Sequence, residues 1–237
     1  MKTKLFFLIS VFILSYTTVF AQTKINAKKN NFEFFIGYNS GALKNLIFAP
    51  VRRYDYNALS YQFGYTRITK REKLFEVQLN YLSSALETNI IAEPNPEYSK
   101  IVLNFSSLKQ IHKSDKLKIH VGLQTQTNVS SYFDWKQYDF QQKLGIAGRF
   151  TYLINDTHSL SSKLTLPFIM WRTSTFEENL YTINRYQSVL WSTEYKYRIS
   201  KHLDFKVNYN FNYDRLQISN AYRELQHQIN LGINFKF

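Results

Sequence analysis

The sequence contains no cysteine and only 7 glycines, 4 prolines and 5 histidines. Without cysteine, the chain has no disulfide framework and no thiolate metal site. Five histidines leave little material for a histidine zinc site, and the sequence has no glycine-rich loop of the kind that cradles a phosphate. We therefore expect neither a metal nor a cofactor.

Long apolar runs are also missing after residue 21, and a membrane-spanning helix needs about 20 apolar residues. The chain is instead rich in aromatic side chains, with 20 Phe and 18 Tyr, and it carries a formal net charge of +13. A charge of this size suits nucleic acid or anionic lipid as a partner. The positions of the charged residues decide between these classes.

The N-terminal residues have the three parts of a secretory signal peptide. Lys2 and Lys4 precede an apolar run over 5–20, and Val19 and Ala21 provide the −3 and −1 positions of a cleavage site. The run is shorter than a spanning helix requires, and no cysteine follows it for lipid attachment. The expected organisation is a cleaved signal peptide at 1–21, a periplasmic tail at 22–30 and one barrel domain at 31–237.

From residue 31 onward, apolar and polar residues alternate with a period of two, which is typical of strands with two unlike faces. Leu203, Phe205 and Val207, for example, alternate with Asp204 and Lys206. Most of these segments reach the length of about 9–11 residues that a tilted membrane strand needs. Ten such segments are predicted: 31–40, 57–69, 73–84, 99–109, 117–127, 140–153, 158–171, 187–199, 202–213 and 223–237.

The links between these segments are alternately long and short, as in outer-membrane barrels with short periplasmic turns and longer external loops. The pattern predicts an all-β fold, an antiparallel transmembrane β-barrel of ten strands, with eight or twelve strands as alternatives. The short links are 70–72, 110–116, 154–157 and 200–201, and the long links are 41–56, 85–98, 128–139, 172–186 and 214–222.

A soluble barrel of the lipocalin type also alternates, with its apolar face turned inward. Two features favour the membrane arrangement and a location in the bacterial outer membrane. The apolar face is too bulky for the interior of so small a barrel, and aromatic residues near the segment ends suit interfacial girdles. These aromatic residues are Tyr65, Tyr81, Tyr152, Trp171, Tyr195, Tyr197 and Tyr213.

The C-terminal residues 230–237 have the order polar–x–Gly–x–x–aromatic–x–aromatic and end in Phe. This segment resembles the terminal signal of Gram-negative outer-membrane β-barrel proteins, by which the barrel-assembly machinery recognises its substrates. The resemblance implies that Asn230, Gly232, Phe235 and Phe237 are the recognised positions and that this machinery is a partner during biogenesis. It indicates a route of assembly and no particular activity.

The charges are distributed unevenly between the two ends of the expected barrel. The N-terminal tail and the short links carry an excess of Lys and Arg, whereas the long links are close to neutral. We therefore expect no basic external platform for lipopolysaccharide phosphates and no nucleic-acid partner. The basic periplasmic edge suits anionic lipid headgroups or a periplasmic partner, and it equally suits turns that are simply solvated.

Charged residues are also expected inside the barrel, because their parity directs them away from the apolar face. Inward Lys and Arg outnumber the acids, which leaves open a narrow anion-preferring channel. In so small a barrel, an interlocked structural plug is the alternative that we favour. The expected lumen charges are Glu76, Lys118, Lys143, Arg149, Lys163, Glu194, Lys196, Arg198, Asp204 and Lys206.

We expect no catalytic residues. The chain resembles outer-membrane proteases of the omptin type in strand count only, and it has no Asp-x-His pair. The rim hydrolase that the sequence allows would use His227 and Asp214, but the parity of His227 directs it toward lipid. Barrel phospholipases use a His-x-Ser order, whereas His158 directly precedes Ser159 here.

The densest aromatic stretch in the predicted external loops is Tyr132, Phe133, Trp135 and Tyr138, our candidate contact site for a protein partner or a ligand. Three functions remain. The leading one is a structural or interaction role, with the barrel as a subunit of a larger outer-membrane assembly. The alternatives are a narrow channel for small solutes and a rim hydrolase acting on lipid or peptide.

Overall fold

The computed structural model describes residues 30–46, 53–88, 97–132, 137–174, 178–217 and 222–237. The predicted signal peptide and nearly all of the predicted tail lie outside this part of the chain. Among the described residues, no helix is long and apolar enough to cross a membrane.

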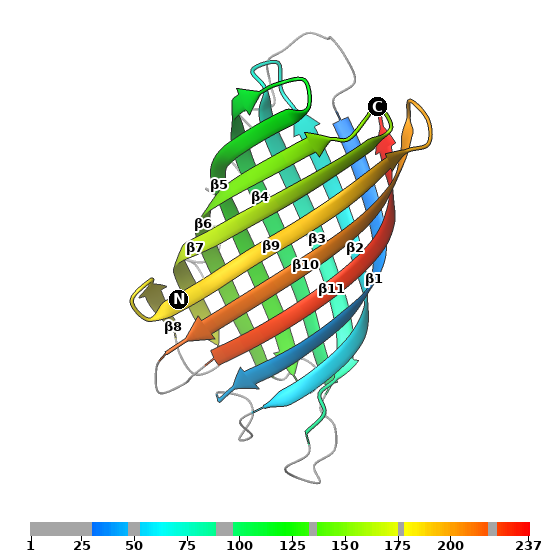
Figure 1. Ribbon diagram of the computed structural model, residues 1–237. Helices are drawn as coiled ribbons and strands as arrows, with labels where there is room; N and C mark the ends of the chain where they lie inside the picture. Colours follow the sequence, from blue (N-terminus) through cyan, green and yellow to red (C-terminus); the bar gives the residue numbers. More distant parts are fainter. Residues whose placement is uncertain (1–29, 47–52, 89–96, 133–136, 175–177, 218–221) are drawn as a thin grey trace.

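The described chain forms eleven antiparallel strands, which wind around one barrel (Figure 1). They are β1 (Asn30–Asn45), β2 (Tyr54–Ile68), β3 (Lys73–Ala85), β4 (Glu97–Lys113), β5 (Leu117–Tyr132), β6 (Gln137–Leu153), β7 (His158–Ser174), β8 (Glu178–Thr182), β9 (Tyr186–Arg198), β10 (Leu203–Leu216) and β11 (Tyr222–Lys236).

Ten of these strands close into a ring. Each of β1 to β7 pairs with its neighbour in sequence, β7 pairs with β9, and β1 pairs with β11 along its full length. Backbone hydrogen bonds between Asn30 and Phe237 join the two ends of the barrel domain. The predicted all-β, ten-stranded antiparallel barrel is confirmed, and the long connections gather at one end, which we call external.

The eleventh strand, β8, was not predicted, because it lies within the expected loop 172–186. It pairs with the external half of β7, from Ile169 opposite Thr182 to Thr173 opposite Glu178. The pairing of β7 with β9 stops at Thr165. Pro167 follows, and proline has no N–H to donate to a ladder. The two halves of β7 therefore pair with different strands.

The strands also run further toward the external end than the sequence predicted. The first segment ends at Asn45 instead of residue 40, and the fifth ends at Tyr132 instead of residue 127. The alternation continues in these extensions, but there the apolar side chains point into the barrel and the polar side chains point outward. In β2, Leu59 faces outward and Ser60 inward, whereas nearer the external end Tyr56 faces inward and Asp55 outward. The reversed stretches looked like loops in the sequence.

Candidate functional site

The inward side chains at the external end form a small apolar core, which we call the external cap. Seven of its members are tyrosines, and most are less than about 7 % exposed, as in the interior of a soluble protein. Large rings bury much apolar area while keeping a hydroxyl for hydrogen bonding. The external cap consists of Leu43, Tyr54, Tyr56, Ala58, Leu82, Leu86, Tyr98, Tyr132, Met170, Tyr181, Tyr186, Leu216 and Tyr222.

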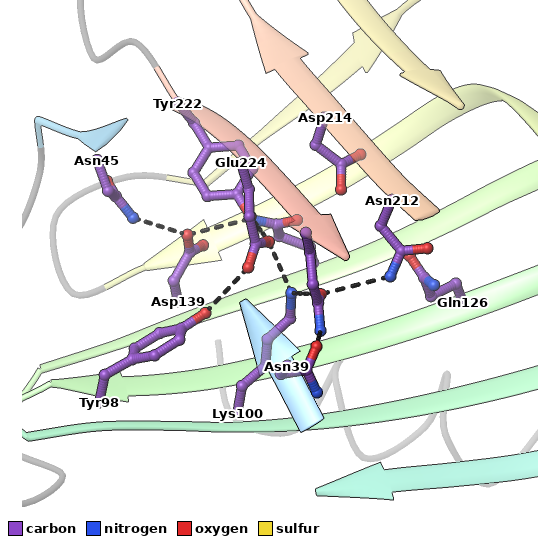
Figure 2. Close-up of polar contacts among 12 residues, drawn as sticks. Asn39, Asn45, Tyr98, Lys100, Gln126, Asp139, Asn212, Asp214, Tyr222 and Glu224 are labelled. Atoms are coloured by element: carbon purple, nitrogen blue, oxygen red, sulfur yellow. Dashed lines mark hydrogen bonds and ion pairs between the residues drawn. The ribbon is translucent and has the colours of Figure 1, made fainter. Parts of the chain in front are cut away.

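The carboxylate of Glu224 on β11 lies beneath the external cap and accepts hydrogen bonds from four side chains. Lys100 Nζ is 2.6 Å from Oε2, and the hydroxyl of Tyr222 donates to the same oxygen at 2.6 Å. The hydroxyls of Tyr56 and Tyr98 donate to Oε1 at 2.9 and 3.3 Å. Figure 2 shows Tyr98 and Lys100 reaching toward Glu224. The carboxylate thus joins β11 to β2 and β4 through the lumen.

A second buried carboxylate, Asp139 on β6, binds Arg172 of β7 in a bidentate pair. Arg172 Nε and Nη2 are 2.9 and 2.8 Å from the two carboxylate oxygens, and both side chains are fully buried. Asn45 at the end of β1 donates to Asp139 at 3.1 Å and accepts from Arg172 at 3.1 Å. Charge-assisted bidentate pairs are strong and fix geometry. This network holds the end of β1 against β6 and β7.

The third carboxylate, Asp214 on β10, receives Lys143 from β6 and the hydroxyl of Tyr186 from β9. The distances are 2.7 Å from Lys143 Nζ to Oδ2 and 2.8 Å from the tyrosine oxygen to Oδ1. Lys143 and Asp214 are both almost completely buried. A buried charge needs such partners, because transfer from water without them is costly.

Amide side chains fill the middle of the lumen. Gln228 on β11 accepts from Asn80 of β3 at 2.9 Å and donates to Ser60 of β2 at 2.9 Å. Beside these groups lies a cavity of about 50 Å³, lined mainly by glutamines and asparagines. A polar cavity of this size has room for a few water molecules, at about 10–15 Å³ each.

A cluster of charged side chains lies closer to the periplasmic end of the lumen. Glu76 on β3 pairs with Arg149 of β6 and with Lys163 of β7, whose Nζ is 2.6 Å from Oε2. Lys206 on β10 lies 2.7 Å from Glu33 and 3.0 Å from Glu194. Glu194 and Lys206 lie on the neighbouring strands β9 and β10. Opposite charges therefore compensate one another throughout this cluster.

The structure gives the remaining expected lumen charges different surroundings. Asp204 is buried and pairs with Lys236 at 2.6 Å, Lys118 and Lys196 are half-buried, and Arg198 is exposed.

Sequence reasoning missed six charged residues of the lumen. Three of the six, Asp139, Arg172 and Asp214, lie beyond the predicted segment ends, and the other three lie within predicted segments. The six are Glu33, Lys100, Asp139, Arg172, Asp214 and Glu224.

The candidate contact residues are divided between the two faces of the wall. Tyr132 is 2 % exposed and belongs to the external cap, so it does not lie on a contact surface. Tyr138 is 44 % exposed, and Phe133 and Trp135 lie outside the described residues.

The two residues of the suggested rim hydrolase do not meet. Asp214 points into the lumen, where it binds Lys143, whereas His227 faces outward and its Nδ1 lies 2.8 Å from the hydroxyl of Tyr209. The described residues also contain no group of three or more His, Asp or Glu side chains placed to hold a metal ion.

The residues of the predicted assembly signal, in β11 and just after it, are divided between the inward and the outward face. Asn230 is buried in the lumen, where it bonds with Asn208 at 3.2 Å, and Gly232 packs against the ring of Phe35. Phe235 and Phe237 are 47 % and 53 % exposed on the outward face. Their role in assembly stays a prediction.

Solved structures of outer-membrane proteins are similar to this one, and two of them are a protease and a channel. The outer membrane protease OmpT from Escherichia coli has a TM-score of 0.62 and 10% sequence identity, over 92% of this chain and 99% of that one. An outer membrane channel from Pseudomonas putida F1 has a TM-score of 0.51 and 10% identity, over 92% and 98%. The chain has the fold of a small outer-membrane β-barrel. Neither a protein-family model nor a curated protein sequence matches it, and identities this low establish the fold alone.

Proposed function

We propose that this protein is an integral outer-membrane barrel with a sealed lumen, which acts as a structural or interaction subunit of a larger assembly. The observation that carries the proposal is the set of ion pairs that cross the lumen. Lys100 to Glu224 links β4 with β11, and Lys163 to Glu76 links β7 with β3. In each case three barrel strands separate the two partners along the wall.

A conducting path would have to pass these bridges. Channels need sites where a solute binds and leaves readily, whereas each buried ion here already has a partner of opposite charge. Removing one member leaves a buried, unpaired charge, which costs about 3–5 kcal/mol. The described lumen charges therefore support a plug better than an anion path.

The external end offers a surface for a companion. Strand β8 pairs with β7 along one edge, and no strand pairs with its other edge among the described residues. Leu180 on β8 and Ile183 in the following turn are 65 % and 64 % exposed, and the exposed Tyr138 lies on β6, on the other side of β7. Unpaired edges beside apolar side chains favour strand addition by a partner. We place the companion at this edge.

The sealed lumen is tested by planar-bilayer recording of the purified protein. We expect no steady single-channel current from the wild-type barrel. Regular unitary currents would overturn the sealed lumen and favour the narrow channel. A matched recording of Tyr98→Ala with Tyr132→Ala, which empties part of the external cap, shows whether the assay detects an opened barrel.

The interaction role is tested by gentle detergent extraction, affinity pull-down and mass spectrometry. We expect a stoichiometric companion with the wild-type protein and its loss in the Leu180→Asp variant. Leu164→Ala, on the outward face of β7 away from β8, is the matched control and should retain the companion. A clean monomer in both cases would overturn the assembly role. We also propose that the protein is not a hydrolase. The variants Asp214→Asn and His227→Ala should therefore leave any hydrolysis of lipid or peptide unchanged.

A further inference from the structure

Three basic side chains form a row on the outward face of the barrel, at the external ends of β1, β11 and β10. The register places Lys44 opposite Arg223 and Arg223 opposite Arg215. The residues on either side of each are buried, and successive side chains of a strand point to opposite faces, so the three basic side chains point away from the lumen. The buried flanking residues are Leu43, Asn45, Tyr222, Glu224, Asp214 and Leu216.

This row is unfavourable on its own. Side chains directly opposite on neighbouring strands have Cβ atoms about 4.5–5.5 Å apart, and like charges at that spacing are destabilising. Among the described residues, no carboxylate forms an ion pair with any of the three. The acids next to them in sequence, Asp214 and Glu224, bind Lys143 and Lys100 on the other side of the wall.

The neighbouring strands do not supply the missing negative charge either. On β9, the residue opposite Arg215 is the neutral Gln187. On β2, Asp55 already pairs with Arg53 at 2.8 Å. The arrangement therefore calls for an anion from outside the chain.

The position of the row indicates which anion. The next outward row toward the periplasm is apolar and consists of Ala42, Leu225 and Tyr213, which are opposite one another in the register. The border between the apolar band of a barrel and its first charged row lies at the headgroup level of the bilayer. At the external end, this is the headgroup level of the outer leaflet.

We propose that Lys44, Arg223 and Arg215 bind the phosphate groups of a phosphorylated outer-leaflet glycolipid, whose acyl chains lie along Leu225 and Tyr213. Guanidinium groups bind phosphate with two parallel hydrogen bonds, and lysine adds a point charge. The expectation of no basic external platform was drawn from summed loop charges, in which Arg215 cancelled Asp214. The wall separates these two residues. The proposal rests on the outer-membrane location given above and requires neither the sealed lumen nor a companion.

The test uses the full-length barrel in phosphatidylcholine nanodiscs with one of three probe lipids: bisphosphorylated lipid A, lipid A without phosphates, or phosphatidylglycerol. Native mass spectrometry measures the bound probe. The variant K44Q/R215Q/R223Q should bind bisphosphorylated lipid A about 100-fold more weakly, since each near-surface Lys or Arg contributes about fivefold. The matched control K70Q/R71Q/K73Q removes the same charge at the periplasmic turn and should bind as the wild type does.

Thermal unfolding supplies a second readout that a merely structural role would not produce. Without phosphorylated lipid, the triple variant should unfold at or above the wild-type temperature, because the repulsion within the row is gone. With bisphosphorylated lipid A, the order should reverse. Equal binding by the triple variant, an equal loss in the periplasmic control, or equal binding of phosphatidylglycerol would overturn this site. A pull-down that retains the companion while lipid binding fails would leave the proposed interaction role intact.

Discussion

The middle of the barrel wall, which we call the membrane band, and the external cap are built from the same strands. In the band the apolar side chains point outward, whereas in the cap they point inward. In the band, outward Leu59 and Phe63 are 62 % and 44 % exposed, and the inward Ser60 and Gln62 are buried. In the cap, the inward Tyr56 is 1 % exposed, and its outward neighbours on β2, Asp55 and Asn57, are charged or polar. The solvent outside the wall changes from lipid to water between the two regions, and the apolar face changes sides with it.

This comparison explains where the buried charges lie. Three carboxylates, Asp139, Asp214 and Glu224, lie where the inward side chains change from apolar to polar, and each has a cationic partner on another strand. The tyrosines of the cap donate additional hydrogen bonds to two of them. The cap therefore depends on a few polar hubs, whereas the band depends on its continuous backbone ladder and on contact with lipid.

The largest loss of stability is expected from removing the carboxylate of Glu224, which binds Lys100 and three tyrosine hydroxyls. Glu224→Ala leaves Lys100, whose side chain is 3 % exposed, without its carboxylate, and it deprives three tyrosine hydroxyls of an acceptor. Breaking a buried ion pair in this way should lower the free energy of unfolding by about 3–5 kcal/mol. Urea unfolding in lipid vesicles, followed by tryptophan fluorescence, measures the loss.

The double variant Glu224→Gln with Lys100→Met is the control for this prediction. It removes both charges together, and replacing a whole buried pair is often close to neutral. We expect it to recover most of the stability. A loss below about 1 kcal/mol in the single variant, the range of exposed pairs, would show that the hub does not hold the cap together.

The next largest loss of stability is expected from an arginine on the outward face of the membrane band, compared with an arginine on the outward face beside the cap. Leu231→Arg puts a charge on the lipid face near the middle of β11, where arginine costs about 2–4 kcal/mol. Asn57→Arg puts the same charge on the outward face of β2 beside the cap and should change stability by less than about 1 kcal/mol. Equal costs in vesicle unfolding would mean that the polarity reversal does not mark the edge of the bilayer.

The sequence was sufficient for the fold because most of each strand lies in the band. Alternation such as Leu59, Tyr61 and Phe63 against Ser60 and Gln62 marks a two-faced strand wherever one solvent covers the outward face. The ten barrel strands followed from this pattern. Strand β8 did not, because five residues beginning with Glu178 are too short for an alternation to be recognised.

The candidate site was harder to predict than the fold. Asp139, Arg172 and Asp214 were assigned to external loops. The inward–outward alternation of each strand was not followed beyond the point where the apolar side chains change from the outward to the inward face. A continued count would have placed Tyr54 and Tyr56 inside the barrel, opposite in phase to Leu59. The partners of Glu224 cannot be predicted from a single sequence, because Tyr56 and Lys100 lie on strands that are distant from it in sequence.

A smaller effect is expected from the contact between Gly41 and the ring of Tyr56. A Cβ at Gly41 would lie 2.3 Å from Tyr56 Cζ, so the ring would have to shift away from Glu224. Gly41→Ala should therefore destabilise the barrel by about 1–3 kcal/mol, as overpacked cores do. Gly148→Ala, where a Cβ meets nothing within 4 Å, is the matched control. If both variants unfold alike, Tyr56 is not held in place by this contact.

The smallest effect is expected from an ion pair that lies outside both regions. Lys113 Nζ is 2.7 Å from Glu72 at the periplasmic turns, about the same distance as in the Lys100–Glu224 pair, but the two side chains are 54 % and 45 % exposed. Exposed pairs contribute about 0–1 kcal/mol, because water already solvates both charges. Lys113→Ala should shift the urea midpoint little, and 1 M salt should abolish the shift. A loss as large as that of Glu224→Ala would show that distance, and not burial, determines which pairs stabilise this barrel.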